Sequence, residues 1–112
     1  MADTKEVPVT ECKFYIPKEL FDTNVEEFVC ICSDMCNLYA KKNHDYGDSF
    51  NKGMDTIGMA YGIGRLYDKM NRIITLSKVK AEVNDENIQD TLIDLACYSV
   101  MTLNYLKGKK NK

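Results

Sequence analysis

The sequence predicts an all-α protein: a compact helical bundle with three main helices, preceded by a poorly ordered N-terminal arm. Three long segments carry apolar residues at the three- and four-residue spacing of an amphipathic helix. The alternating pattern of a half-buried strand does not occur in the sequence. With 112 residues the chain suits a single domain, which we divide into an arm over 1–22, a helical domain over 23–107 and a basic tail over 108–112.

Composition narrows the class of partner. The net charge of −2 argues against a general nucleic-acid-binding protein, because such proteins are strongly basic. No apolar run approaches the roughly 20 residues that span a bilayer, and the N-terminus has no signal-peptide pattern. Five cysteines, an odd number, lie mostly in apolar helical patterns and suit buried, reduced thiols. We therefore expect a cytoplasmic protein that does not bind membranes.

The first predicted helix begins at Thr23 and ends near Lys42. Thr23 with Glu26 three residues later fits a capping box, which predicts a helix start. Apolar residues then recur every three or four positions as far as Tyr39. The next segment, residues 43–53, is rich in turn-forming residues and is predicted to be a loop.

The second predicted helix begins between Asp55 and Ile57 and runs to about Lys78. Gly58 and Gly62 lie four apart on one side of it, where they would let a neighbouring backbone or a ligand come close. The third helix is capped by Asn84 or Asp85 and runs to about residue 107, with apolar residues on more than one side. We expect it to be central in the bundle. The glycine surface and this apolar excess together predict a homo-oligomer, a dimer or larger.

Charged residues gather on the two helices of the predicted hairpin. Glu86, Asp90 and Asp94 recur every fourth residue and form an acidic ridge, which is unfavourable in an isolated helix unless a cation shares it. Two readings follow. Ion pairs with the preceding helix could clamp the hairpin, in which Arg72 and Lys69 would face Glu86 and Asp90. Alternatively, the carboxylates could hold Mg²⁺, which prefers oxygen ligands. The charged residues concerned are Asp68, Glu86, Asp90 and Asp94 as metal ligands, and Arg65, Lys69 and Arg72 as partners of the acids or of ligand phosphates. Tyr46, Tyr61, Tyr67 or Tyr98 could flank a base.

Three motifs occur in this order: Lys42-x-x-Asp45-Tyr46-Gly47, Gly64-Arg65-x-x-Asp68-Lys69-x-x-Arg72, and Glu86-x-x-x-Asp90-Thr91-x-x-Asp94-Leu95-Ala96-x-Tyr98. As a set they resemble the nucleotide modification associated domain (type 1) family of phage and prophage proteins. That family is in turn similar to the MazG-like all-α nucleotide pyrophosphatases, which bind Mg²⁺ and assemble as dimers or tetramers. The resemblance implies nucleotide binding by Lys42, Asp45, Tyr46, Arg65, Lys69, Arg72 and Tyr98.

The sequence departs from the MazG-like pattern in its acids. That pattern has two carboxylates three residues apart on the first helix of the hairpin. In this sequence that helix has Asp68, accompanied by Lys69 and Arg72. The difference favours a protein that binds a di- or triphosphate or a cyclic nucleotide in a pocket of the bundle. Such a protein could sequester an immune signalling nucleotide in the cytoplasm of a phage-infected host. The first alternative is a Mg²⁺-dependent nucleotide pyrophosphohydrolase. The second is a structural partner of a nucleotide-modifying enzyme.

Overall fold

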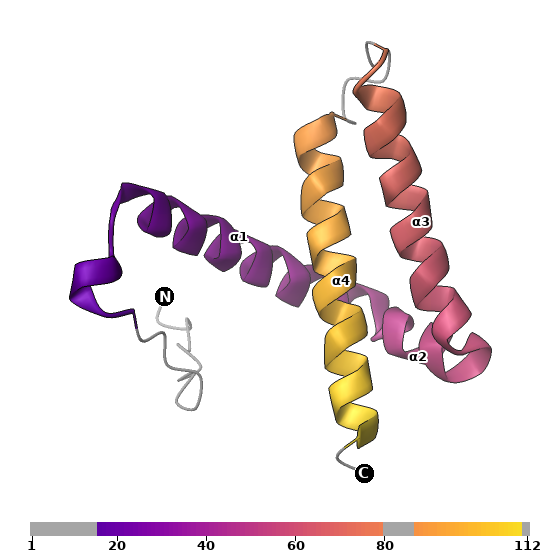
Figure 1. Cartoon of the computed structure of the whole chain (residues 1–112). Coiled ribbons are helices and arrows are strands. Elements are labelled where there is room, and N and C mark those ends of the chain that lie inside the picture. Colours follow the sequence, from indigo (N-terminus) through magenta and orange to yellow (C-terminus); the bar gives the residue numbers. More distant parts are fainter. Residues whose placement is uncertain (1–15, 80–86, 111–112) are drawn as a thin grey trace. The chain divides into compact units, whose positions relative to one another are not determined.

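The structure is a computed structural model that describes residues 16–79 and 87–110. A short 3-10 turn at Lys18–Leu20 precedes four α-helices (Figure 1): α1 (Thr23–Tyr46), α2 (Ser49–Ile57), α3 (Met59–Leu76) and α4 (Ile88–Lys110). The described residues contain no strand, so the predicted all-α fold is confirmed. Of the N-terminal arm predicted over 1–22, residues 1–15 lie outside the described ranges, as does Glu86, and the described remainder contains the 3-10 turn at Lys18–Leu20.

Contacts along the chain divide it into two compact units, Met1–Ser33 and Asp34–Lys112. The division falls inside α1. The C-terminal part of that helix therefore belongs to the same unit as α2, α3 and α4, and this second unit contains every residue of the site described below.

Helices α3 and α4 form an antiparallel hairpin and make the most extensive contact between elements of the second unit (Figure 1). Gly62 of α3 is buried in this contact. A Cβ at Gly62 would lie 3.2 Å from the sulfur of Met54 and 3.3 Å from the hydroxyl of Thr102. Of the two glycines predicted to allow a close approach, Gly62 is closely packed, by side chains of the same chain, whereas a Cβ at Gly58 would meet nothing within 4 Å.

The small core gathers where α2 meets this hairpin. Phe50 and Met54 lie four residues apart on α2, so that one face of the short helix is buried. Thr91 and Thr102 of α4 are also buried, and their hydroxyls donate to the carbonyls of Asn87 and Tyr98 at 3.0 and 2.7 Å. These bonds satisfy hydroxyls that would otherwise make burial costly.

The prediction of a loop over residues 43–53 is wrong. Only Gly47 and Asp48, with φ of 60° and 61°, leave the helical region there, and α2 begins at Ser49. The turn-forming residues of this segment obscure a helical signal, because Phe50 and Met54 have the four-residue spacing of a buried helical face. The predicted second helix is likewise interrupted at Gly58, whose φ of 92° suits glycine and separates α2 from α3.

The helix starts also differ from the prediction. Asp22, rather than Thr23, caps α1, because its carboxylate accepts a hydrogen bond from the backbone N–H of Val25 at 2.9 Å. Asn87 caps α4, with its side-chain oxygen 2.8 Å from the backbone nitrogen of Asp90. The chain thus enters α4 later than predicted, and α4 continues to Lys110.

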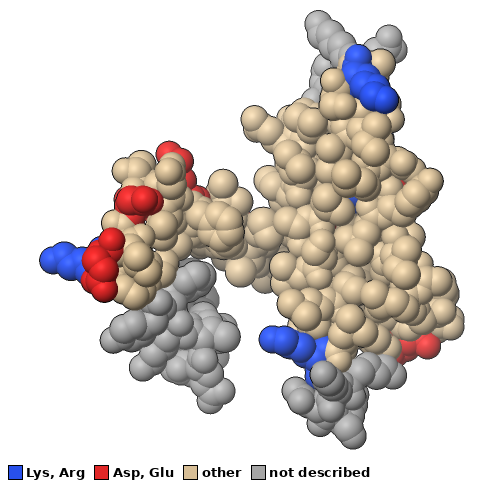
Figure 2. Space-filling model, in the orientation of Figure 1, with Lys and Arg blue, Asp and Glu red and all other residues tan. Residues whose placement is uncertain are grey.

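The apolar composition of α4 predicted that the helix would be covered on most sides, but it is not. Leu92, Val100 and Leu103 each keep about half of their surface exposed. In Figure 2, the visible face over α3 and α4 carries few charged side chains between its two ends. None of the described helices is long and apolar enough to cross a membrane.

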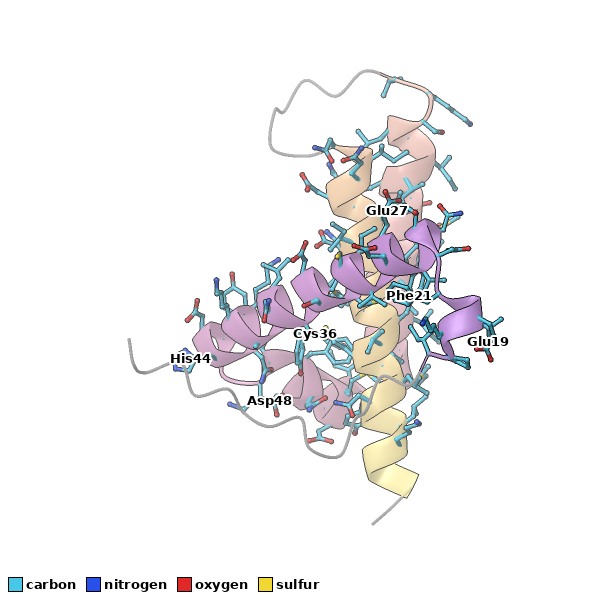
Figure 3. All side chains as sticks on the ribbon, turned by 90° about the vertical axis from the view of Figure 1, so that its left-hand side faces the viewer. Glu19, Phe21, Glu27, Cys36, His44 and Asp48 are labelled. Atoms are coloured by element: carbon cyan, nitrogen blue, oxygen red, sulfur yellow. The ribbon has the colours of Figure 1, made fainter. Side chains whose placement is uncertain are left out.

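Two of the cysteines predicted to be buried are exposed. Cys30 and Cys36 of α1 are exposed, whereas Cys32 and Cys97 are half-buried. In Figure 3, Cys36 is on α1, His44 projects near the end of that helix, and Asp48 lies in the turn that follows. The apolar pattern of α1 therefore predicted more buried residues than the structure has.

Candidate functional site

A pocket of about 330 Å³ opens in the second unit among the C-terminal part of α1, α2, the first turns of α3 and the middle of α4. Its lining combines two kinds of side chain. The aromatic residues are Tyr39, Tyr46, Phe50, Tyr61 and Tyr98, and the charged residues are Lys42, Arg65, Lys69 and Asp94.

The aromatic residues form a cluster around Phe50. The ring centroid of Phe50 is 5.6 Å from that of Tyr61 and 6.0 Å from that of Tyr98, with tilted ring planes. These distances are typical of favourable aromatic pairs. Because Phe50 is buried, the cluster is anchored in the core and gives the pocket one firm apolar wall.

Arg65 is held against this cluster. Its guanidinium carbon lies 5.2 Å from the centroid of the Tyr61 ring, and Nη2 donates to the Tyr61 hydroxyl at 3.5 Å. The hydrogen bond that Arg65 donates to Tyr61 raises the pKa of Arg65 above its usual value, against the opposing effect of partial burial. Arg65 therefore presents a permanent positive charge beside the aromatic wall.

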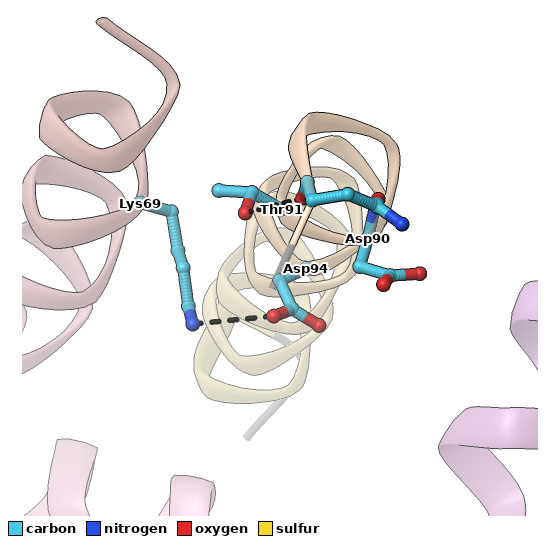
Figure 4. A network of polar contacts seen from close by, with 5 residues as sticks. Lys69, Asp90, Thr91 and Asp94 are labelled. Atoms are coloured by element: carbon cyan, nitrogen blue, oxygen red, sulfur yellow. Dashed lines mark hydrogen bonds and ion pairs between the residues drawn. The ribbon is translucent and has the colours of Figure 1, made fainter. Parts of the chain in front are cut away.

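Lys69 of α3 reaches across to Asp94 of α4, with Nζ 3.2 Å from Oδ2 (Figure 4). Both side chains are largely covered, with 22% and 33% of their surfaces exposed. The pair also borders a second pocket of about 360 Å³, whose polar lining adds Arg72, Asp90 and Thr91. Since the two pockets share Leu38, Lys42, Lys69 and Asp94, they adjoin along this ion pair.

The charge of the two pockets contrasts with that of the chain. Four cations line them, Lys42, Arg65, Lys69 and Arg72, against the two carboxylates of Asp90 and Asp94. The whole protein carries a net charge of −2. A local excess of positive charge in a recess attracts anions more strongly than the same charges would on an open surface.

Of the predicted site residues that the structure describes, all but two line these pockets. Asp45 lines neither pocket, and its carboxylate lies 3.2 Å from His44 Nδ1 in an exposed pair. Asp68 is exposed and is likewise absent from both linings. The residues brought together are Lys42, Tyr46, Arg65, Lys69, Arg72, Asp90, Asp94 and Tyr98.

The predicted register of the charged strips is off by one helical turn. We expected Lys69 to face Asp90, but Lys69 pairs with Asp94, and the Asp90 carboxylate points away from Lys69 (Figure 4). Sequence spacing places Asp90 and Asp94 on one face of a helix without fixing which of them stands opposite a given residue of the neighbouring helix.

Within residues 16–79 and 87–110, no three histidine, cysteine or acidic side chains come close enough to hold a metal ion. Asp90 and Asp94 do line the second pocket together. The third member of the predicted ridge, Glu86, lies outside these ranges. The magnesium site formed by Asp68, Glu86, Asp90 and Asp94 therefore stays a prediction.

Two lining residues of α1, Tyr39 and Asn43, were not predicted as site residues. Together with the predicted Lys42 and Tyr46 they follow one another at three- and four-residue spacing along one side of α1, a pattern that could have placed all four in one wall. Cys97 and Met101 repeat the same spacing on α4. Burial raises the pKa of the Cys97 thiol, and the nearby Asp94 carboxylate makes a smaller contribution in the same direction.

Residues 42–106 match the sequence pattern of the nucleotide modification associated domain 1. The chain belongs to the nucleotide modification associated domain 1 family. The matched segment contains every charged residue that lines the two pockets of this family member, from Lys42 to Asp94. Comparison with curated proteins and with solved structures gave no match.

Proposed function

We propose that this member of the nucleotide modification associated domain 1 family binds a phosphate-bearing nucleotide across its two adjoining pockets. The observation that carries the proposal is the pairing of an aromatic wall with a line of cations in one recess. A nucleotide has the matching composition, since its base stacks on aromatic rings and its phosphates bind Arg and Lys. The family description, which associates the domain with nucleotide modification, supports the same class of ligand.

The base would lie in the first pocket, against Tyr61, Tyr98 and the exposed ring of Tyr46. The volumes of about 330 and 360 Å³ fall within the range of small-molecule sites. Phosphates placed between the pockets would meet Lys42 and Lys69, which border both. Arg65 would approach them from the aromatic side, and Arg72 from the second pocket.

Binding without cleavage is the form that we favour. The positions three residues from Asp68 are occupied by Arg65 and Asn71, so the second carboxylate of the metal-binding pattern is missing from α3, and Asp68 itself stays outside the pockets. A protein of this kind would lower the free concentration of its ligand, whether a di- or triphosphate or a cyclic signalling nucleotide, in the cytoplasm. We expect it to act as a homo-oligomer.

A Mg²⁺-dependent pyrophosphohydrolase is the second candidate function. The observation in its favour is that Asp90 and Asp94 share the second pocket with Arg72. Two carboxylates with phosphate oxygens and water would suit the oxygen-rich coordination of Mg²⁺. In that case the metal would activate water and neutralise the pyrophosphate leaving group, while Arg72 and Lys69 would orient the phosphates.

The first experiment is calorimetric titration of the purified protein with ATP, ADP, AMP, adenosine, tripolyphosphate and cyclic di-AMP, with and without Mg²⁺, and with chromatography of the recovered ligand. We expect ATP to bind more tightly than adenosine or tripolyphosphate alone, because each of these fills only one half of the site. Arg65→Ala should weaken ATP binding by about 10- to 150-fold, the equivalent of one charge-assisted contact of about 1.5–3 kcal/mol.

Two matched controls make this test specific. Lys78→Ala removes an exposed cation from the turn that follows α3, outside both pockets, and should leave the affinity unchanged. Tyr61→Phe removes the hydroxyl that accepts from Arg65 Nη2, whereas Tyr67→Phe makes the same change on an exposed side chain of the same helix. We expect only Tyr61→Phe to weaken binding. Equal effects of Arg65→Ala and Lys78→Ala, or no binding of any compound, would refute the proposed site.

A further inference from the structure

The α3–α4 hairpin has an exposed apolar surface that the pockets do not use. On α3 it consists of Ile63, Tyr67, Met70 and Ile74, which lie four, three and four residues apart. On α4, Leu92, Leu103 and Leu106 lie in a similar register, with Val100 at its edge. These eight side chains keep between 44% and 67% of their surface exposed. We call this surface the hairpin face.

Helix geometry places both stripes on the same side of the hairpin. Each exposed stripe comes one residue after the stripe that packs inside, as Ile63 follows Gly62 and Leu92 follows Thr91. One residue is a turn of about 100° about the helix axis. Because the two helices run in opposite directions, the same turn rotates them in opposite senses, and both stripes point to one side.

The pocket residues lie on the other side of the same two helices. Arg65 and Asp94 each come three residues after an inner residue, Gly62 and Thr91, a rotation of about 300° that is equivalent to 60° in the opposite sense. The hairpin face itself contains no charged residue. Figure 2 agrees, because charged side chains are scarce on the visible face over α3 and α4.

We propose that the hairpin face binds a second copy of this chain, so that two α3–α4 hairpins form a four-helix bundle. The exposed area of the eight side chains is on the order of 700 Å² per chain, close to the roughly 800 Å² that each partner buries in a standard stable interface. It also exceeds the largest apolar patch of a typical monomer, which is about 300–600 Å².

The residue spacing identifies a helical partner of the same kind. Alternating steps of four and three residues, as in Ile63, Tyr67, Met70 and Ile74, make the seam along which helices pack at a small crossing angle. A two-fold axis through the face would bring this seam against its counterpart or against that of α4. With the pockets on the opposite side, the dimer keeps both of them open to ligand.

Sedimentation equilibrium of the full chain over about 1–100 µM tests the proposal. We expect a mass of about 26 kDa, twice the 12.8 kDa of one chain. Leu103→Glu and Ile63→Glu, one on each helix of the face, should each weaken dimerisation by at least 100-fold and give the single-chain mass at 10 µM. Ile57→Glu is the matched control, because Ile57 is equally exposed but ends α2 outside the face. It should leave the dimer intact.

Circular dichroism of each variant accompanies the mass measurement, since a charge added at a surface exposed in the single chain should not unfold it. Unfolding of both face variants beside a folded, dimeric Ile57→Glu would also support the proposal, because it would show that dimerisation stabilises the chain. A wild-type mass of 12.8 kDa at 100 µM would overturn it, and would mean that another part of this chain covers the face or that it stays exposed. A dimer that persists in both Leu103→Glu and Ile63→Glu would also overturn the proposal. Nucleotide titration of Leu103→Glu keeps this test separate from that of the pocket.

Discussion

A pair of glycine substitutions tests the packing on which the aromatic wall depends. A Cβ at Gly53 of α2 would lie 2.5–2.8 Å from three carbon atoms of the Tyr61 ring, closer than any real contact. A Cβ at Gly64 of α3 would meet nothing within 4 Å. Both residues lie inside helices, so the two Gly→Ala substitutions share the gain in helix propensity and differ in steric cost.

The expected magnitudes follow from these two contributions. Replacing glycine by alanine inside a helix gains about 1 kcal/mol, so Gly64→Ala should stabilise the fold by about that amount. At Gly53 the same gain is opposed by overpacking of about 1–3 kcal/mol. Tyr61 cannot yield freely, because its ring packs on Phe50 and holds the Arg65 guanidinium. Gly53→Ala should therefore leave the free energy of unfolding unchanged or lower it by up to about 2 kcal/mol.

Thermal unfolding followed by circular dichroism at 222 nm measures the difference. For a domain of about this size, 1 kcal/mol corresponds to a change of about 4–8 °C in Tm. The Tm of Gly64→Ala should thus exceed that of Gly53→Ala by at least about 4 °C. Both proteins should be compared at one concentration, because association would raise Tm with concentration.

The site offers a second measurement on the same pair. A displaced Tyr61 would move both the aromatic wall and the partner of Arg65, so Gly53→Ala should weaken nucleotide binding while Gly64→Ala leaves it unchanged. Equal Tm values for the two variants, or a Gly53→Ala protein more stable than Gly64→Ala, would refute the packing of α2 against Tyr61.

Two further predictions concern single side chains. Met54→Ala should lower the free energy of unfolding by about 2–5 kcal/mol in urea titrations, because Met54 is 2% exposed and its removal leaves a cavity; a loss below about 1 kcal/mol would mean that the core lies elsewhere. Burial, with a further contribution from Asp94, raises the pKa of Cys97, so its thiolate fraction at pH 8 is lower than that of an ordinary thiol. Iodoacetamide should therefore alkylate the exposed Cys36 faster than Cys97 at pH 8, and the rate at Cys97 should keep rising at higher pH; equal rates under mass-spectrometric mapping would contradict this.

Periodicity was sufficient to predict the fold class and the long helices, because α1, α3 and α4 each repeat apolar residues over several turns. It was insufficient for α2, where two apolar residues stood among turn formers and the decisive features were single backbone angles at Gly47, Asp48 and Gly58. Composition also gave a wrong prediction of how much of α4 is buried. Its apolar residues suggested burial on most sides, whereas a helix can be equally apolar when part of its surface is left for a partner.

The site was predicted in its composition more than in its geometry. The cations Arg65, Lys69 and Arg72 were predicted from one helix, but the rest of the lining also includes α1 and α2 residues that only the tertiary fold brings near. The match of Lys69 with Asp94 rather than Asp90 depends on how far one helix slides along the other. That register depends on contacts between the two helices, such as the close packing of Gly62 on Thr102, which no pattern within a single helix contains.

The ion pair between Lys69 and Asp94 separates the two candidate functions. In a protein that only binds, the Asp94 carboxylate competes with ligand phosphate for Lys69, since the two lie 3.2 Å apart and largely covered. Asp94→Asn keeps the shape, frees the lysine and removes a repulsive charge, so ATP affinity without Mg²⁺ should increase, by about 10-fold for a gain of about 1.4 kcal/mol. In a Mg²⁺-dependent hydrolase the same carboxylate would be a metal ligand, and its loss should abolish turnover and weaken Mg²⁺-dependent binding. Tighter binding in Asp94→Asn would therefore support the binding function, whereas weaker binding confined to the Mg²⁺ titration would support the hydrolase. An affinity unchanged under both conditions would place the phosphates away from Lys69 and would contradict both.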